Sequence, residues 1–337
     1  MVSSSSDKDA LTVAQLKSLP PGKTQPFFGV YLLKKVDIKT ARNGAEFLSA
    51  EFADRSGIFH TTCFEDQPPY AGLSETSEGA IVRIAGQTAY YQERFSPRLA
   101  SFEVLDENEA ASYLSGLVET SPEAPEQLLE ELQTLIERIA HPVLRATVTC
   151  VFESLGVDFN TATAALNMHH AYRHGLLEHT VHVARAAAAL LPLYQEVNPD
   201  LALAGALLHD VGKVLEYSQG LSPKRTRQGV LQGHVVLGYR LMRKAALQNK
   251  LDAELVERLE HIILSHQGEL EWGAAAMAAT PEAVFVSLVD NLDAKMGMVQ
   301  HALRTTPQHN EFSAYLPGLK TALLTTPVPL LPSPEEG

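Results

Sequence analysis

The chain has 337 residues, of which 45% are hydrophobic and 20% charged, and its formal net charge is −13 at pH 7. This length and composition suit a globular protein of two domains, and no apolar run approaches the ~18–20 residues that a membrane-spanning helix needs. The acidic balance also disfavours a uniformly basic surface for nucleic acid, so any contact with phosphate depends on local charge.

Residues 1–22 are rich in serine and end at Leu19-Pro-Pro-Gly22, which predicts a flexible N-terminal segment or a short helix. Neither a basic n-region nor an apolar h-region is present, so we expect no secretory signal. The only cysteines, Cys63 and Cys150, lie in unrelated segments, which argues against a disulfide framework or a zinc ribbon. We therefore expect a cytoplasmic protein that does not associate with membranes.

Residues 23–106 have the composition of a β domain. Five segments are enriched in β-branched and aromatic residues: 27–36, 46–53, 57–64, 80–89 and 99–105. Turn signals such as Asn43-Gly44 and Pro68-Pro69 separate them. Five short strands within about 80 residues predict a five-stranded OB-like β-barrel, which is a fold that binds nucleic acids.

Residues 107–125 are predicted to be a linker, in which Ser121-Pro-Glu-Ala-Pro125 leads into a helix start. The region 126–310 then shows helical periodicity. It predicts helices over 127–152, 175–191, 199–211, 231–248, 252–266 and 281–303. The Pro-rich tail, 311–337, is expected to lack regular structure. The predicted fold class is α+β multidomain, with the β-barrel followed by an all-α domain.

Histidines gather in the helical region together with carboxylates. They are His169, His170, His174, His179, His182, His209-Asp210, His234, His261 and His266, followed by Asp290 and Asp293. A single helical histidine is usually structural, but imidazoles and carboxylates that converge from facing helices bind divalent transition metals. This chemistry predicts one or two ions, with Mn²⁺ favoured, Fe, Co, Zn and Ni compatible, and Mg²⁺ disfavoured.

The apolar run 202–208 leads directly into His209-Asp210 and places this pair at the buried end of a helix. A buried aspartate costs several kcal/mol unless it is paired or binds a metal. Gly212 then ends the helix, and Lys213 adds a cation next to the pair. The local pattern therefore predicts that Asp210 acts at a metal site.

A second apolar run, 284–289, leads into Asp290. Asp293 follows three residues later on the same helical face. We expect Asp290 to be a metal ligand and Asp293 to support the ligands from outside.

The stretch Leu207-Leu-His-Asp-Val-Gly-Lys213 resembles the motif of the HD superfamily of metal-dependent phosphohydrolases, whose pattern is His…His-Asp…Asp. The resemblance implies the following primary ligands: His179, His209, Asp210 and Asp290. It also implies His234 and His266 as ligands of a second ion, with His261 and Gln267 in supporting positions. This chain has Gln267 where the family often has a further histidine, so the number of ions stays open.

Three further stretches resemble the YhaM-type 3′→5′ exoribonucleases. They are 169–180, 263–273 and Val289-Asp-Asn-Leu-Asp-Ala-Lys295. In that family an OB-fold precedes the HD domain, which agrees with the order predicted here. The resemblance implies a 3′→5′ exonuclease that hydrolyses single-stranded RNA, or also single-stranded DNA, to nucleoside monophosphates.

The expected chemistry is hydrolysis of a phosphodiester. A bound divalent ion lowers the pKa of a water towards ~7, and the resulting hydroxide would attack phosphorus in line. Asp210 would bridge or orient the ions, and Lys213 would neutralise charge that develops on the phosphoryl oxygens.

Substrate binding is assigned to basic and aromatic residues. No acid lies between Glu216 and Asp252, and within this stretch Lys224, Arg225 and Arg227 are predicted to guide a strand. Stacking of a base on an aromatic ring stabilises binding by ~1–3 kcal/mol. The candidates in the β domain are Phe28, Tyr31, Phe59, Phe64, Tyr90 and Tyr91.

Two other functions stay open. One is an HD phosphohydrolase that acts on free or cyclic nucleotides, and the other is a regulatory protein that binds single-stranded nucleic acid with an idle HD centre. The long helical region 126–152 is also compatible with a homo-oligomer.

Overall fold

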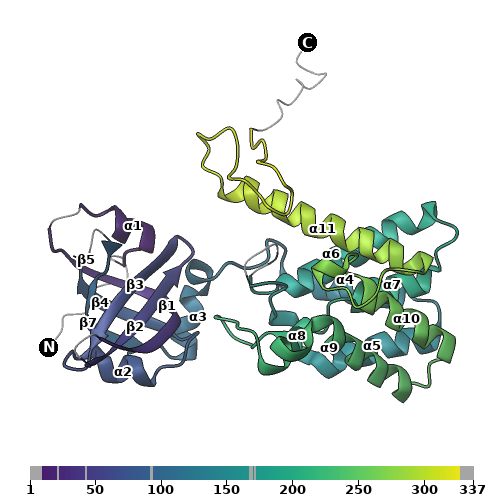
Figure 1. Ribbon diagram of the computed structural model, residues 1–337, viewed down its shortest axis with the longest axis horizontal. Coiled ribbons are helices and arrows are strands. Elements are labelled where there is room, and N and C mark those ends of the chain that lie inside the picture. Colours follow the sequence, from purple (N-terminus) through teal and green to yellow (C-terminus); the bar gives the residue numbers. More distant parts are fainter. Residues whose placement is uncertain are drawn as a thin grey trace, which may run out of the picture. The chain divides into compact units, whose positions relative to one another are not determined.

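The computed structural model describes residues 10–20, 23–41, 44–91, 94–166, 170 and 172–326. Contacts divide the chain into a β unit, Met1–Thr120 with Ser218–Lys224, and a helical unit, Ser121–Tyr217 with Arg225–Gly337 (Figure 1). The division thus falls at 120–121, and a short segment from the second half of the chain joins the β unit. The expectations for 1–9, 21–22, Asn43 and 327–337 lie outside the described residues.

One antiparallel sheet organises the β unit. Its strands, in the order in which they pair, are β3 (Gly57–Phe64), β2 (Glu46–Asp54), β1 (Pro26–Thr40), β4 (Ile81–Gln87) and β7 (Arg98–Val104). The Thr61 hydroxyl of β3 donates to the Pro97 carbonyl, next to β7, at 2.5 Å, yet no ladder joins these edge strands among the described residues. The predicted barrel is therefore a curled sheet that is not closed, which is compatible with an OB-like fold.

The aromatic core of the β unit corrects two predicted base-stacking residues. The Phe59 ring lies 5.1 Å from the Tyr31 ring and 5.4 Å from the Phe52 ring, centroid to centroid, and all three side chains are fully buried. The Tyr31 hydroxyl donates to the Leu11 carbonyl at 2.7 Å. Because neither Tyr31 nor Phe59 reaches solvent, the prediction that they stack bases is wrong.

Other aromatic residues of the β unit do reach solvent. Tyr91 is 70% exposed and lies in a short hairpin of β5 (Tyr90–Tyr91) and β6 (Arg94–Phe95). Phe64 and Tyr90 are also exposed, and Phe28 is half-buried. Base stacking by these residues stays a prediction.

Three short helices complete the β unit: α1 (Val13–Ser18), α2 (Pro69–Glu75) and α3 (Glu107–Leu117). α1 lies in the segment predicted to be flexible or a short helix, and it agrees with the second alternative, because Thr12 caps its N-terminus and Leu16 is fully buried. α2 forms where the sequence predicts a turn, since proline suits the first turn of a helix. α3 corrects the predicted linker, because it buries Leu117 against Val30 and Leu32.

The helical unit contains eight α-helices among the described residues. They are α4 (Pro125–Glu137), α5 (Pro142–Thr161), α6 (Gly175–Leu190), α7 (Pro199–Leu208), α8 (Lys213–Glu216), α9 (Arg227–Gln248), α10 (Ala253–Ser265) and α11 (Pro281–Thr305). Two 3₁₀ turns accompany them, η2 (Leu191–Leu193) and η3 (Leu270–Trp272). The predicted helix 127–152 is in fact two helices, because Pro142 starts a new one and the ring of His141 caps it.

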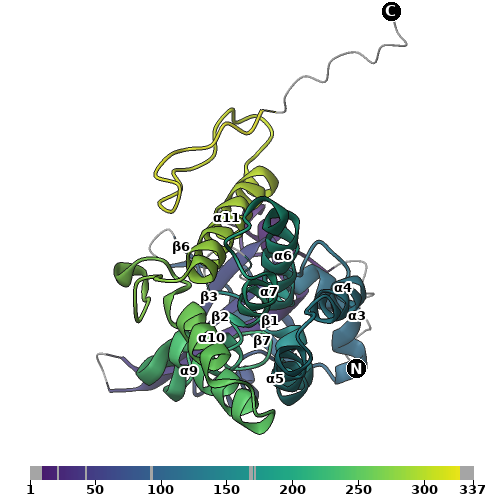
Figure 2. The same cartoon turned by 90° about the vertical axis from the view of Figure 1, so that its right-hand side faces the viewer.

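α7 is the central helix of this unit. Every residue from Leu201 to Leu208 is buried, and α4, α5, α6, α10 and α11 pack around it (Figure 2). An apolar helix that is covered on all sides holds whatever follows its C-terminus in the interior. The structure therefore confirms that His209 and Asp210 lie at the buried end of a helix.

After α11 the chain turns back on itself. Isolated bridges join Phe312 to Leu324 and Leu316 to Thr321, so the described part of the predicted tail is a hairpin-like loop. No described helix is both long and apolar enough to cross a membrane.

The burial of Phe59 generates a prediction for stability. Phe59→Ala should lower the free energy of unfolding by about 3–5 kcal/mol, because it removes a ring from the core of the β unit. Tyr91→Ala is the control and should change stability by less than about 0.5 kcal/mol, since its ring is exposed. Calorimetry of the full chain measures both, and equal effects of the two substitutions would contradict the core assignment.

Candidate metal centre

Two helices of the helical unit end in the same way. The ring of His209 folds back at the end of α7, and its Nδ1 donates to the Ala206 carbonyl at 2.7 Å. The ring of His266 does the same at the end of α10, where Nδ1 donates to the Ile263 carbonyl at 2.7 Å. The last carbonyls of a helix lack intrahelical donors, and these rings supply them. Both imidazoles are fully buried and point Nε2 at the same interior space.

Two glycines bring His234 to this space. A Cβ on Gly212 would lie 1.9 Å from the His234 carbonyl oxygen, so only glycine lets α9 approach the end of α7 this closely. Gly233 has φ 68° and ψ 161°, a conformation that glycine alone adopts readily, and it breaks α9 just before His234. The His234 Nδ1 donates to the Glu216 carboxylate at 2.8 Å, which orients the ring.

His179 of α6 and the aspartates of α11 complete the group. The His179 Nδ1 donates to Asp293 Oδ2 at 2.7 Å. Asp290 Oδ1 lies 3.2 Å from His179 Nε2 and 3.7 Å from His209 Nε2. Asp290 thus faces the ligand atoms, while Asp293 holds the far side of one imidazole, as the spacing predicts.

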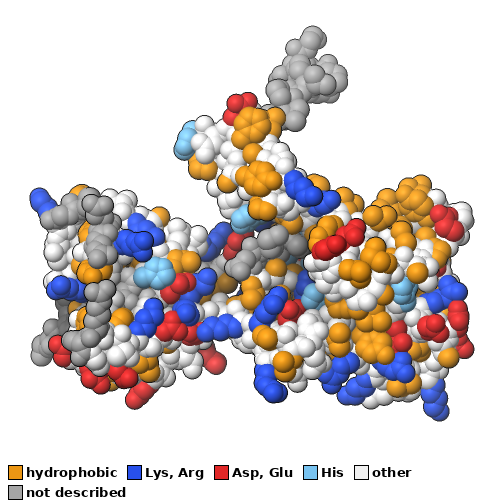
Figure 3. Space-filling view, in the orientation of Figure 1, with side chains coloured by type: hydrophobic (Ala, Val, Ile, Leu, Met, Phe, Trp, Pro, Cys, Tyr) orange, Lys and Arg blue, Asp and Glu red, His pale blue; other side chains and the backbone are white. Residues whose placement is uncertain are grey.

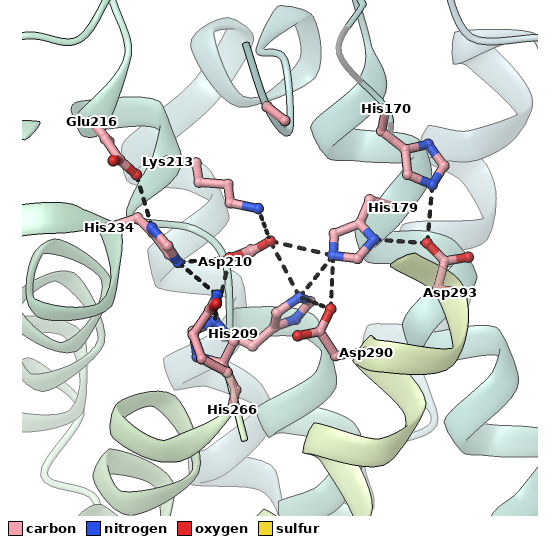
Figure 4. Close-up of polar contacts among 12 residues, drawn as sticks. His170, His179, His209, Asp210, Lys213, Glu216, His234, His266, Asp290 and Asp293 are labelled. Atoms are coloured by element: carbon pink, nitrogen blue, oxygen red, sulfur yellow. Dashed lines mark hydrogen bonds and ion pairs between the residues drawn. The ribbon is translucent and has the colours of Figure 1, made fainter. Parts of the chain in front are cut away.

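Asp210 lies between two pairs of imidazoles, as Figure 4 shows. Its Oδ2 is 3.3 Å from His179 Nε2 and 3.4 Å from His209 Nε2. Its Oδ1 is 3.5 Å from the Nε2 atoms of both His234 and His266. One carboxylate therefore joins two groups of possible ligands, each of which contains two histidines.

The hydrogen bonds of these groups fit divalent cations. Because each of the four imidazoles donates through Nδ1, each presents Nε2 as an acceptor. The Nε2 atoms of His179 and His209 lie only 3.1 Å apart, and the buried Oδ1 of Asp210 has no hydrogen-bond partner among the described residues. Ligand atoms that share one ion at ~2.1 Å lie about 3.0–3.4 Å from one another. At His179, His209 and Asp210 the acceptor atoms otherwise face one another, and a bound metal ion would satisfy them.

The charge of the centre leads to the same conclusion. Asp210, Asp290 and Asp293 converge in the interior, and of the described lysines and arginines only Lys213 pairs with them, at 2.5 Å from Asp210 Oδ2. Burial alone would raise the pKa of Asp290, but its interactions with His209 and His179 outweigh burial and lower the pKa to about 2. Burial is likewise outweighed at Asp210, where Lys213 and His209 hold the pKa well below its ordinary value. The carboxylates therefore stay ionised at neutral pH.

The pKa of His179 depends on the same buried carboxylates. Burial lowers its pKa, but hydrogen bonds with Asp210, Asp290 and Asp293 outweigh burial and raise the pKa well above the ordinary value. A proton and a divalent ion compete for the same Nε2. The negative field that holds a proton there also attracts a metal cation.

A further group of residues surrounds Asp293, and the sequence did not predict a role for these residues. His170 contacts Asp293 through Nε2 at 3.0 Å and Glu178 through Nδ1 at 2.8 Å, and the Tyr172 hydroxyl donates to Glu178. His182 Nδ1 lies 3.3 Å from Asp293 Oδ1. Burial would raise the pKa of Asp293, but its imidazole partners hold the pKa well below the ordinary value. The signal in the sequence was a glutamate, Glu178, next to His179 in a helix of mostly apolar residues.

The remaining predicted supporting residues differ in their positions. The amide of Gln267 lies 3.1 Å from the Nε2 atoms of both His234 and His266, so it is part of the centre. His261, by contrast, accepts a hydrogen bond from the Ala279 backbone N–H at 2.8 Å. Its ring caps a loop, and the prediction that it supports His266 is corrected.

The three basic residues predicted to guide a strand differ in their contacts. Lys224 belongs to the β unit, where it pairs with Glu78, whereas Arg225 lies 3.6 Å from Glu216 in the helical unit. Arg227 is exposed. Figure 3 shows acidic and basic side chains mixed on the visible face of each unit, in keeping with the acidic composition. Strand guidance by these residues stays a prediction.

A cavity of about 740 Å³ opens over the centre. His179, Asp210, His234 and Asp290 line its floor, together with Lys213. This volume is in the range that nucleotide-sized ligands occupy. The ligand atoms are thus accessible to a substrate, although their side chains are largely buried.

Comparison with known protein families finds an HD domain over residues 176–295. The matched range includes the six predicted ligands: His179, His209, Asp210, His234, His266 and Asp290. HD domains are typically metal-dependent hydrolases, so the match points to a metal-dependent phosphohydrolase that uses a divalent ion. The identity of the metal is a separate question, and the exoribonuclease, OB-fold and RNA-binding predictions rest on the resemblance and not on this match.

The position of Asp293 generates a prediction for metal affinity. Asp293→Asn should weaken Mn²⁺ binding about 10–100-fold, because the amide holds the Nδ1 proton of His179 less strongly than the carboxylate does. Titration calorimetry measures the affinity. Asp158→Asn, at an exposed position of α5, is the matched control and should bind as the unchanged chain does.

The bridging position of Asp210 generates a second prediction. Mn²⁺ at one hundred times its Kd should stabilise the folded chain by about 2.7 kcal/mol, since it binds only the folded state. Asp210→Asn should remove most of this gain, because both ligand groups share this carboxylate. Calorimetry with and without EDTA measures the effect, and an equal gain in the variant would rule out Asp210 as a ligand.

Proposed function

We propose that this chain is a metal-dependent 3′→5′ exonuclease that hydrolyses single-stranded RNA, or also single-stranded DNA, to nucleoside monophosphates. The observation that carries the proposal is the carboxylate of Asp210 between two pairs of imidazole acceptors, on the floor of an open cavity. The HD domain supports phosphohydrolase chemistry, and the resemblance to YhaM-type enzymes supports the strand as substrate.

The residues present would hold one or two divalent ions. His179, His209, Asp210 and Asp290 would hold the first, and His234 and His266 would share Asp210 with the second. When bound, such an ion polarises a phosphoryl oxygen and makes a nucleophile available at neutral pH. Mn²⁺ is the favoured ion, since mixed imidazole and carboxylate ligands suit it better than they suit Mg²⁺.

The protein's own groups position the scissile phosphate. The Lys213 ammonium is buried beside Asp210, and its pKa is raised because the nearby Asp210 charge outweighs the effect of burial. It therefore stays charged and stabilises negative charge on the phosphoryl oxygens. The bond from phosphorus to the 3′ oxygen of the preceding nucleotide breaks, a water supplies the new oxygen, and the leaving oxygen ends as a 3′-hydroxyl.

Hydrolysis of a free or cyclic nucleotide is the alternative function. It is favoured by one observation, which is that every residue around the cavity belongs to the helical unit, so that a small substrate needs no part of the β unit. A strand substrate would give the β unit a role, because its exposed aromatic residues can stack bases.

A time course with RNA labelled at the 5′ end tests the proposal. With Mn²⁺ we expect a ladder that shortens from the 3′ end, and with EDTA we expect intact RNA. The double substitution His209→Ala with Asp210→Ala should abolish hydrolysis, because it removes ligands from both groups. Denaturing gels measure the products.

His301→Ala is the control for this experiment, because His301 is an exposed histidine of the same unit. It should digest RNA at the rate of the unchanged chain. Intact RNA with every metal, together with hydrolysis of free or cyclic nucleotides, would favour the alternative. Activity that survives the double substitution would show that the centre described above is not the catalytic site.

A further inference from the structure

The rim of the cavity carries charged and aromatic side chains that are not part of the metal centre. Lys295 of α11, Trp272 of η3 and the segment Pro317–Lys320 line the cavity together with the floor residues. The rim thus joins three parts of the chain that are far apart in the sequence. Two lysines and a tryptophan are the groups expected around a phosphate and a base.

Lys320 reaches the cavity at the tip of a hairpin-like loop, residues 311–325. Phe312 bridges to Leu324 and Leu316 to Thr321, and the turn closes where the Lys320 N–H donates to the Pro317 carbonyl at 3.2 Å. Lys320 has φ 57°, in the left-handed region that glycine and asparagine adopt more readily. A lysine at this position places an ammonium group at the tip, where glycine would fit the backbone better.

Both rim lysines are available to an anion. Lys295 and Lys320 are exposed, and neither forms an ion pair with any residue in the described part of the chain. Lys213, on the floor, is already paired with Asp210. The two rim lysines therefore add positive charge beyond what the scissile phosphate receives from the floor.

Trp272 offers a flat apolar surface at the same rim. It is the only tryptophan of the sequence, and its side chain is 57% exposed although it lines the cavity. η3, which carries it, lies between two glycines with positive φ, Gly268 at 83° and Gly273 at 108°. An exposed indole beside free ammonium groups can stack a base while its phosphates are held.

We propose that Lys295 and Lys320 bind the phosphate adjacent to the scissile one, in a nucleotide substrate whose base stacks on Trp272. The C-terminal loop 311–325 is then part of the substrate site. This inference rests on the proposed function, because it assumes that the floor holds a scissile phosphate. The ligand it requires has at least two phosphates, either the next phosphodiester of a strand or the second phosphate of a free nucleotide.

The test compares two substrates of the full-length chain with Mn²⁺. Single-stranded RNA has an adjacent phosphate, and bis(p-nitrophenyl) phosphate has none. Lys295→Ala and Lys320→Asn should each raise KM for RNA about tenfold, with a much smaller change for the small diester. Each should also reduce the slope of log KM against log salt by ~0.7, as expected for one lost phosphate contact on a single strand.

Trp272→Ala tests the base. It should raise KM for RNA about 5- to 100-fold, again with a smaller change for the small diester, and Trp272→Phe should restore most of the loss. An equal loss with both substrates would show that Trp272 only shapes the cavity, and it would overturn the stacking role.

Matched controls separate binding from folding. Lys250 is also a lysine with positive φ, at 55°, and it does not line the cavity, so Lys250→Asn matches Lys320→Asn. Lys244→Ala, at an exposed position of α9, matches Lys295→Ala. Both controls should leave KM and the salt slope unchanged. Lys320→Arg should keep most of the affinity, because it keeps the charge.

The outcomes distinguish the inference from the function on which it rests. If the protein without substitutions hydrolyses neither substrate, the proposed function is wrong. An active chain whose lysine variants keep the KM and the salt slope for RNA, and also keep the inhibition by a nucleoside diphosphate, would overturn the inference alone. Inhibition of the hydrolysis by a nucleoside diphosphate identifies the source of the second phosphate. If the lysine variants weaken this inhibition but keep the KM for RNA, the source is a free nucleotide. If they raise the KM for RNA, the source is a strand.

Discussion

The helical unit depends on one constraint, which is the buried carboxylate of Asp210. It lies within 3.5 Å of the Nε2 atoms of four imidazoles, and one of its oxygens has no hydrogen-bond donor in the described structure. An ionised carboxylate in such a position is tolerated only if positive charge compensates it. Lys213 supplies part of that charge, and the geometry of the acceptors indicates that divalent ions supply the rest.

The surrounding fold can be understood as the means of holding those acceptors in place. The imidazoles of His209 and His266 use the free carbonyls at the ends of two helices, and the imidazoles of His179 and His234 use carboxylates behind them. In each case Nδ1 is engaged and Nε2 faces inward, so the tautomer is set before any ion binds. The close approach at Gly212 serves the same end, because it brings α9 against the turn that carries Asp210.

In the proposed function, the metal centre and the rim of the cavity have different roles in substrate binding. The floor offers ligands that suit any phosphoryl group, so it confers chemistry with little selectivity. Selectivity must come from groups further out, and within the helical unit the rim lysines and Trp272 are the available ones. The acidic composition does not conflict with the proposed substrate, since local charge and not net charge determines where a phosphate binds.

The sequence by itself determined the local features of this protein. The apolar run before His209-Asp210 predicted its burial, residue types predicted a metal centre, and enrichment in β-branched and aromatic residues predicted all five strands of the sheet, because each signal lies within one element. Only the tertiary structure decided which distant groups meet. It buried Tyr31 and Phe59, turned His261 towards a loop, joined His170 to Asp293 across 123 positions and brought Lys320 to the cavity. These contacts depend on the packing of segments that are far apart in the chain, and no local pattern encodes that packing.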